Sequence, residues 1–291
     1  MNYQKYLWLL FSFFIINSCT NEQSQELTST EPAQGKLFII GGGKRPVEMI
    51  RSMVSISGVD TSGFIIILPM SSTLPDTASF YGVKQFTDLG LKHVFAMNFT
   101  DSSDITPERI DSLKHASLIY ISGGDQSRFM EVVEETPVYH AIHEAFNSGA
   151  LIAGTSAGAA VMSAKMITGN EFKHPEYTGN FRTIEANNIE IAKGLGLLEN
   201  VIIDQHFIRR MRMNRLISAC LENPEETGIG IDESTAILVD NNLATVYGKS
   251  QVIVLRHKSA ETKIVHGLLG AENLELNIYL PGDSFLLVPG F

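Results

Sequence analysis

From residue 36 onward, apolar runs alternate with segments of helical periodicity. The apolar runs predict five strands, at 36–40, 64–70, 93–99, 117–124 and 150–155. The segments between them predict helices at 46–57, 75–89 and 107–116, and one long helix that ends near residue 147. Strands that are apolar throughout are typically buried on both faces, and alternating β and α units give a parallel sheet. The pattern therefore predicts the α/β class, with a doubly wound, mostly parallel sheet sandwich.

The rest of the chain is less regular and is predicted to be β-rich toward the C-terminus. Residues 166–190 contain glycines and a proline and indicate a long loop near the site. A strand at 200–207, a helix at 208–221 and a strand–turn–strand unit at 228–248 are predicted to follow. The sequence shows no internal repeat, so residues 36–291 are expected to form a single domain.

The first 19 residues, 1–19, have the pattern of an export signal. One early lysine precedes an apolar run from about residue 6 to residue 16, which as a helix rises only about 16 Å, half of a bilayer core. The run ends in Ile-Asn-Ser-Cys, which resembles a bacterial lipobox and would make Cys19 a lipidated N-terminus. Plain secretory cleavage, with Cys19 incidental, is the alternative. Residues 20–35 are polar and predict a flexible tether, so we expect an extracytoplasmic domain, lipid-anchored to a bacterial membrane.

Composition adds little to this picture. The net charge of −10 argues against nucleic-acid binding, which needs a basic surface. The chain has two cysteines, and lipidation of Cys19 would leave Cys220 without a partner, as a buried small residue of a predicted helix. The stretch GGGKR, 41–45, lacks the spacing of a P-loop and indicates a strand-end turn close to the site. The sequence contains no metal-binding pattern, so no metal and no cofactor is expected.

The fifth predicted strand runs directly into GTSAGAA, residues 154–160. This stretch fits the G-x-S-x-G pattern of a nucleophile elbow, in which Ser156 occupies a strained strand-to-helix turn. Gly154 and Gly158 lack the Cβ atoms that would collide in such a turn, and the N–H of Ala157 could donate to an oxyanion. The alternative is a tight corner that serves packing alone, so the interpretation depends on a base and an acid elsewhere.

A histidine at the end of a predicted strand is the candidate for the base. His206 ends the apolar run VIIDQHF, whereas His140 and His143 lie on a predicted helix with a spacing that matches no zinc motif. Asp232 and Glu233 follow a segment that looks buried, and as neighbours on a strand only one of them should face the site.

Four arginines follow the candidate base in FIRRMRMNR, residues 207–215. On a helix, Arg209, Arg212 and Arg215 would drift by about 60° per step and form one stripe. This stripe is either a solvated basic face or a set of guanidinium groups that recognise substrate carboxylates. The acidic balance of the whole chain favours recognition.

Four motifs in this order resemble the cyanophycinase and aspartyl-dipeptidase family of serine peptidases, most closely its cyanophycinase branch. They are GGDQ at 123–126, GTSAGAAVMS at 154–163, DQHF at 204–207 with the arginines after it, and GIGIDESTA at 228–236. The resemblance covers residue 36 to at least residue 250, and it implies the flavodoxin-like fold of class I glutamine amidotransferases. It also implies a possible homodimer and a peptide or polymer substrate with aspartyl and arginyl groups. The family substrate, cyanophycin, is a poly-aspartate backbone with arginine on each β-carboxyl.

The resemblance implies roles for residues in these motifs. Ser156 would be the nucleophile, His206 the general base and acid, and Glu233 the acceptor that orients the imidazole. The N–H groups of Gly124 and Ala157 would form the oxyanion hole. The residues that would line the substrate pocket are Gln126, Asp204, Gln205, Arg210, Arg212 and Arg215.

Two alternatives remain open. An α/β-hydrolase esterase would follow the order serine, acid, histidine, which Asp232 with His257 or His266 could supply. A lipoprotein that binds without cleaving could have kept the same fold. The preferred interpretation is an exported serine exopeptidase that cleaves β-aspartyl-arginine polymer or related aspartyl peptides through an acyl-enzyme.

Overall fold

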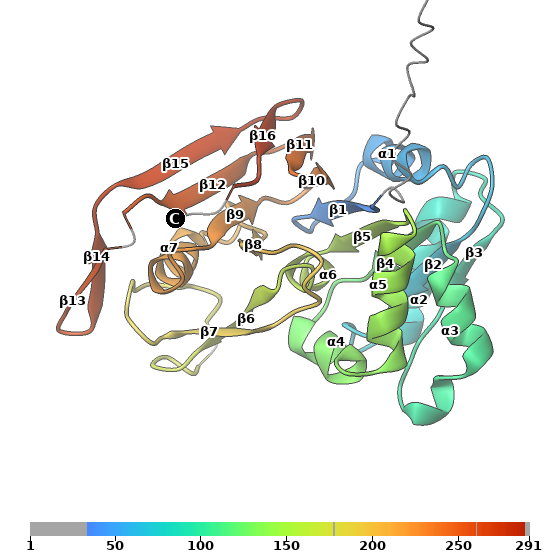
Figure 1. Ribbon diagram of the computed structural model, residues 1–291, viewed down its shortest axis with the longest axis horizontal. Helices are drawn as coiled ribbons and strands as arrows, with labels where there is room; N and C mark the ends of the chain where they lie inside the picture. The colour runs from blue at the N-terminus through green and yellow to red at the C-terminus, as the bar shows by residue number, and fades with distance from the viewer. Residues whose placement is uncertain (1–33, 177, 260, 289–291) are drawn as a thin grey trace, which may run out of the picture. The chain divides into compact units, whose positions relative to one another are not determined.

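The computed structural model describes residues 34–176, 178–259 and 261–288, and its centre is an eight-stranded sheet (Figure 1). Its parallel strands lie in the order β1 (Lys36–Ile40), β5 (Leu151–Thr155), β4 (Leu118–Ile121), β2 (Ile65–Leu68) and β3 (Val94–Ala96). Beyond β1 the sheet continues with antiparallel β10 (Thr235–Asp240), β11 (Leu243–Gly248) and β16 (Ser284–Leu286). The parallel strands are those that the apolar runs predict, and the α/β fold class is confirmed.

Both faces of this sheet are buried, which explains why its strands are apolar throughout. On one face, Phe38 and Ile40 of β1 belong to a core that also includes residues of α1 (Val47–Ser57) and α2 (Pro75–Thr87). On the other face, Leu37 and Ile39 belong to a core with residues of α3 (Pro107–Lys114), α4 (Gln126–Val133) and α5 (Pro137–Asn147). A short 3₁₀ helix, η1 (Ser102–Asp104), precedes α3.

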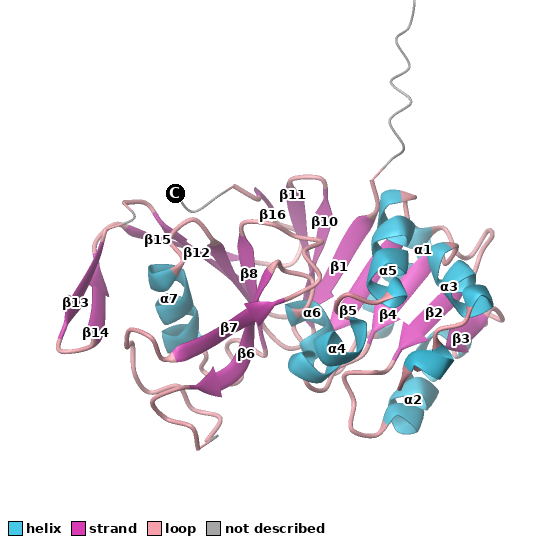
Figure 2. Ribbon diagram, turned by 60° about the horizontal axis from the view of Figure 1, so that its bottom comes forward, coloured by secondary structure: helices cyan, strands magenta, loops and turns pink. Residues whose placement is uncertain are grey.

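A second, four-stranded sheet carries the later part of the chain (Figure 2). Its strands lie in the order β15 (Leu274–Tyr279), β12 (Val252–His257), β9 (Thr227–Ile231) and β8 (Val201–Gln205). Val201 and Ile203 of β8 point into a core shared with the main sheet, whereas Ile202 packs in a separate core with residues of α7 (Met213–Glu222). Two further strand pairs are β6 (Lys165–Glu171) with β7 (Ile189–Lys193), and β13 (Thr262–Val265) with β14 (Leu268–Ala271). The β-rich C-terminal part is therefore confirmed, and the predicted strand at 200–207 belongs to this second sheet.

The strand–turn–strand unit predicted at 228–248 contains one more break. The chain leaves the second sheet at the end of β9 and enters the main sheet at β10, with a turn at 232–234 between them. Ser234 has a φ of 57°, which turns the chain sharply at this crossing. Glu233 therefore lies between the two sheets rather than on a strand.

The helix predicted at 208–221 begins only at Met213, so the first part of that prediction is wrong. Residues 207–212 form turns, and Met211 has a φ of 51°, which a right-handed helix cannot include. The long helix predicted to end near residue 147 is divided into α4 and α5 for a similar reason. Glu135 has a φ of 59°, and Pro137 then begins the second helix.

The loop predicted at 166–190 is only partly a loop. It contains most of β6 and the start of β7, which pair with a register shift. The described residues all fall in one compact unit, Pro32–Phe291, and none of their helices is long and apolar enough to cross a membrane. Cys19, the predicted signal segment and most of the predicted tether lie outside the described residues.

Candidate active site

Ser156 lies in a strained turn between β5 and α6 (Ala157–Ala160). Its φ of 54° and ψ of −110° are outside the regions that residues with a Cβ atom normally adopt. A Cβ on Gly154 would lie 2.1 Å from the carbonyl oxygen of Gly158, and one on Gly158 would lie 2.3 Å from that of Ile121. Only glycine allows these backbone segments to approach so closely, so the turn has the geometry of a nucleophile elbow.

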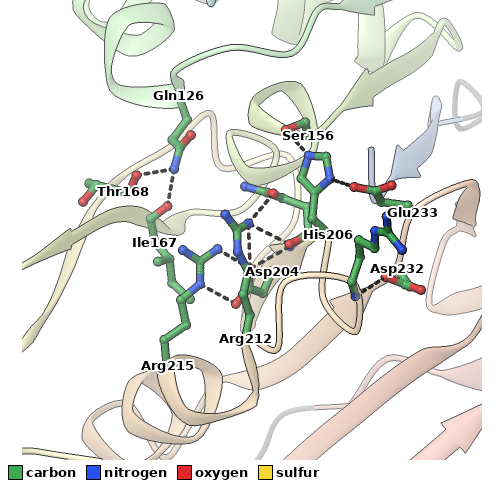
Figure 3. Close-up of polar contacts among 12 residues, drawn as sticks. Gln126, Ser156, Ile167, Thr168, Asp204, His206, Arg212, Arg215, Asp232 and Glu233 are labelled. Carbon is green, nitrogen blue, oxygen red and sulfur yellow. Dashed lines mark hydrogen bonds and ion pairs between the residues drawn. The ribbon is translucent and has the colours of Figure 1, made fainter. Parts of the chain in front are cut away.

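The Ser156 hydroxyl is hydrogen-bonded to His206, which is in turn bonded to Glu233 (Figure 3). Oγ of Ser156 lies 2.9 Å from Nε2 of His206, and Nδ1 of His206 lies 2.7 Å from Oε1 of Glu233. When Nδ1 carries the proton and donates it to the carboxylate, Nε2 is an acceptor that can take the serine proton. The structure thus brings together the three residues that the resemblance implies, in the arrangement of a serine hydrolase.

The end of β1 holds the backbone of all three contributing segments. The carbonyl groups at residues 40–42 accept, in turn, from the N–H groups of Ser156, His206 and Ser234, at 3.0, 2.7 and 2.9 Å. Because these bonds arise from consecutive residues, they fix the elbow, the end of β8 and the sheet crossing relative to one another.

Gly42 and Gly43 press directly against the site. A Cβ on Gly42 would lie 2.4 Å from Cε1 of His206, and one on Gly43 would lie 2.8 Å from Cβ of Glu233. Their φ values, +103° and +69°, also lie in the region that favours glycine. The strand-end turn predicted for GGGKR is confirmed, and its glycines leave the room that the imidazole and the carboxylate occupy.

Burial lowers the pKa of His206 below its ordinary value. The hydrogen bond that the imidazole donates to Glu233 opposes this effect, whereas the charges of Arg210 and Arg212 lower the pKa further. The imidazole is therefore neutral at neutral pH, which is the form that a general base requires.

Asp232 faces away from His206. Its carboxylate accepts from the backbone N–H of Arg209 at 2.9 Å and from the hydroxyl of Ser250 at 2.7 Å. Only one of the two neighbouring acids meets the histidine, as predicted, although they lie in a turn rather than on a strand. Asp232 instead stabilises the chain segment that follows the histidine.

The histidines that the α/β-hydrolase order needs lie elsewhere. His257 ends β12 and is fully buried, with its Nε2 3.4 Å from the hydroxyl of Ser259. His266 lies in the turn between β13 and β14. Since the Ser156 hydroxyl meets His206, this placement does not support the esterase alternative.

Asp204, Arg212 and Arg215 form a buried ion cluster, not a stripe on a helix (Figure 3). The Asp204 carboxylate accepts from Nε of Arg215 at 2.7 Å and from its Nη2, and it lies 3.7 Å from Nη1 of Arg212. Each of the three residues is at most 3% exposed. The predicted stripe is wrong because residues 207–212 are not helical, so Arg209 is exposed while Arg212 turns inward.

The predicted pocket residues differ in how the structure holds them. Arg212 donates to the backbone oxygen and to Oε1 of Gln205, at 2.7 and 2.6 Å. Gln126 donates its Nε2 to the carbonyl oxygens of Ile167 and Thr168, at 2.7 and 2.5 Å. Arg210 is exposed. Contact of this set with substrate stays a prediction, and the structure shows that Gln126, Asp204 and Arg212 also bond to backbone groups.

Gly124 lies in the loop that follows β4, and Ala157 directly follows Ser156. Ala157 is the first residue of α6, so its N–H has no acceptor within that helix. A Cβ on Gly124 would lie 2.0 Å from the carbonyl oxygen of Ser71, which brings the loops after β2 and β4 together. A Cβ on the adjacent Gly123 would lie 3.3 Å from Cβ of Ser156. The oxyanion role of the two N–H groups stays a prediction that this placement allows.

A cavity of about 280 Å³ opens beside Ser156 and His206. Arg45, Tyr120 and Thr155 also line it, and the sequence analysis missed all three. Arg45 ends the GGGKR stretch and could have been noticed there, whereas a tyrosine within an apolar strand gives no signal. Cavities of about 680 and 830 Å³ lie elsewhere, and no residue of the Ser156–His206–Glu233 triad lines either of them.

Cys220 is buried, and burial raises the pKa of its thiol to about 12. The thiol is therefore protonated and unreactive, as expected for a small core residue. Among the residues that the structure describes, no cluster of histidine, cysteine and acidic side chains could hold a metal ion.

Comparison with known proteins places this site in a family. The family model described as Peptidase family S51 matches residues 37–247. A cyanophycinase of Nostoc sp. is 33% identical over 276 residues, which cover 91% of this chain and 90% of that protein. A cyanophycinase of Synechococcus elongatus is 30% identical over 266 residues, which cover 87% and 80%.

The fold agrees with this similarity. The crystal structure of a peptidase from an acI-B1 Actinobacterium superposes with a TM-score of 0.63 at 24% identity, covering 88% of this chain and 98% of that one. The chain belongs to peptidase family S51 and is a serine-type peptidase.

Proposed function

We propose that this peptidase hydrolyses β-aspartyl-arginine polymer, or closely related aspartyl peptides, from the chain end. The observation that carries the proposal is the continuous hydrogen-bonded chain from the Ser156 hydroxyl through His206 to Glu233. The names of the related cyanophycinases support the substrate class.

Acylation begins when Oγ of Ser156 attacks the scissile carbonyl carbon and Nε2 of His206 takes the hydroxyl proton. The Glu233 carboxylate stabilises the imidazolium that forms. The N–H groups of Gly124 and Ala157 are the donors proposed for the oxyanion. His206 then gives the proton to the departing amine nitrogen, the C–N bond breaks, and the acyl group stays on Ser156.

Deacylation repeats these roles with water. A water molecule attacks the acyl carbon while His206 takes its proton, and the same proton then returns to Oγ of Ser156. The product leaves as a carboxylic acid that ionises in solution. The neutral state of His206 at neutral pH allows both steps to begin.

Labelling with a fluorophosphonate tests the triad without assuming a substrate. The wild-type chain is expected to gain one adduct, on Ser156, and His206→Ala should lose labelling and peptide turnover by about 10³-fold or more. His140→Ala, an exposed histidine on α5, is the matched control. An undiminished rate in His206→Ala, with the fold intact by circular dichroism, contradicts the proposed triad.

We also propose that the chain is exported and anchored through a lipid on Cys19. The apolar run that ends in Ile-Asn-Ser-Cys supports this proposal, and an external address suits an enzyme that degrades a polymer outside the cell. In a bacterial host, Cys19→Ala is expected to move the protein from the membrane fraction to a soluble fraction. Mass spectrometry of the N-terminal peptide should show the lipid only in the wild type, and an unlipidated wild-type Cys19 contradicts the anchor.

A further inference from the structure

The cavity beside Ser156 is lined by hydrogen-bond donors that the peptidase mechanism above does not use. Tyr120 and Thr155 come from the ends of the adjacent strands β4 and β5, and Arg45 comes from the segment after β1. Tyr120 is 2% exposed and Thr155 is 6% exposed. The Tyr120 hydroxyl interacts with Thr155 and with Gln85 of α2, but neither hydroxyl makes a hydrogen bond of good geometry to another described residue. Buried polar groups normally make well-formed hydrogen bonds, so two hydroxyls that have only poor contacts with their neighbours, at one cavity wall, are available to bind an acceptor on a ligand.

Gln85 of α2 orients this group of donors. Its Oε1 accepts from Nε of Arg45 at 2.7 Å, which leaves its Nε2 as a donor that is buried and also lacks a partner of good geometry. The guanidinium carbon of Arg45 lies 5.9 Å from the ring centroid of Tyr120, so the charge is held over this wall of the cavity. With Nε bound to Gln85, the Nη groups of Arg45 form the end of the fork that can meet a ligand.

The charge of the lining residues favours a negatively charged ligand. Arg45 carries the only formal charge among the described lining residues at neutral pH, since none of them is acidic and His206 is neutral. Burial raises the pKa of Tyr120, with smaller opposing effects from Arg45, Gln85 and Thr155, so the phenol remains a donor rather than an anion. A carboxylate matches a guanidinium and two hydroxyl donors in both charge and geometry.

We propose that Arg45, Tyr120 and Thr155 form a subsite for a substrate carboxylate close to the scissile bond. The inference rests on the proposed function, because it assumes that Ser156 marks where the scissile carbonyl lies. A carboxylate bound there would accept hydrogen bonds from the buried hydroxyls. It would also hold the substrate in the cavity that Ser156 lines. The enzyme would therefore require a free carboxylate at this position, and peptides that carry an amide in its place would bind poorly.

Equilibrium binding to the full-length Ser156→Ala chain tests the subsite without turnover. The probes are β-aspartyl-arginine and its two mono-amides, one at each carboxylate, measured by calorimetry. One of the two amidations is expected to weaken binding about 10- to 100-fold, as for loss of a charged hydrogen bond. Adding Arg45→Gln should remove that preference, and Tyr120→Phe should reduce it about 3- to 10-fold while keeping the ring.

Arg51→Gln, an exposed arginine on α1, is the matched control and should leave the preference unchanged. Equal binding of all three probes to the parent chain, or a preference that survives in Arg45→Gln, overturns the subsite. A separate assay measures whether the wild-type chain releases dipeptide from the polymer. If release occurs without a carboxylate preference, only the subsite fails. If the preference depends on Arg45 but no release occurs, only the proposed substrate fails.

Discussion

The close approach of Gly42 to His206 predicts a large effect from a single methyl group. In Gly42→Ala the new Cβ would lie 2.4 Å from Cε1 and 2.5 Å from Nε2 of the imidazole. Carbon atoms in contact are normally about 3.5–4.0 Å apart, so the ring must retreat by about 1 Å. A retreat of this size breaks a hydrogen bond that is 2.9 Å long in the wild type, between Ser156 and His206.

The expected cost follows from this displacement. A misplacement of about 1 Å in a catalytic group lowers the rate roughly 10²-fold. An alanine at position 42 would also have to adopt the φ of +103° that Gly42 has. This backbone strain should destabilise the folded Gly42→Ala chain by about 1–3 kcal/mol. Gly42→Ala should therefore lose both fluorophosphonate reactivity and stability.

A second glycine separates strain from collision. Gly58, which caps α1 with a φ of +66°, has nothing within 4 Å of its ideal Cβ. Gly58→Ala should lower the free energy of unfolding, measured by urea denaturation, by about 1 kcal/mol. It should leave the labelling rate of Ser156 unchanged. The assay is the second-order rate of adduct formation, followed by intact-protein mass spectrometry. A Gly42→Ala chain that labels as fast as the wild type would refute the reasoning.

Three further predictions concern the groups around His206. Glu233→Gln should lower kcat roughly 10³- to 10⁴-fold in a peptide-turnover assay while the protein remains folded, because the amide cannot stabilise the imidazolium. In Arg210→Gln, removal of a positive charge should raise the pKa of His206, so the acid limb of the kcat/KM profile should move to higher pH. Arg215→Leu should lower the free energy of unfolding by about 3–5 kcal/mol in urea, since Asp204 would lose its closest buried partner.

Each of these has a control elsewhere in the chain. Glu48→Gln alters an exposed acid of α1 and should leave kcat unchanged. Arg209→Gln alters an exposed neighbour and should move the acid limb less than Arg210→Gln does. Lys36→Met breaks an ion pair with Asp240, both about 41% exposed, and should cost less than about 1 kcal/mol. Equal effects in a variant and its control would contradict the corresponding assignment.

The sequence predicted the parallel sheet and the position of Ser156 because both depend on local pattern. Strands buried on both faces must be apolar throughout, and their carboxyl ends share one edge of the sheet. The glycines around Ser156 are needed because a Cβ atom at either position would collide with neighbouring backbone. Such features need no knowledge of distant segments.

The choice between Asp232 and Glu233 could not be made from spacing alone. It depends on the crossing between two sheets, where a turn directs Asp232 toward Ser250 and Glu233 toward His206. The prediction of an arginine stripe on a helix was wrong for a related reason. Met211 adopts a positive φ that no propensity scale indicates, and the turn buries Arg212.

The donors of the further subsite were missed because each is unremarkable in its own segment. Tyr120 belongs to an apolar strand, Thr155 adjoins the nucleophile, and Arg45 follows a glycine run. Only the parallel pairing of β4 with β5 brings the first two together, and only the path of the chain after β1 adds the third.

Incubation of the full-length chain, in mild detergent, with insoluble β-aspartyl-arginine polymer tests the central claim most directly. Mass spectrometry of the soluble products is expected to show β-aspartyl-arginine dipeptide, released by the wild type and not by Ser156→Ala. A wild-type chain that forms the fluorophosphonate adduct on Ser156 but releases no dipeptide would contradict the proposed substrate. Release that persists in Ser156→Ala would contradict the mechanism.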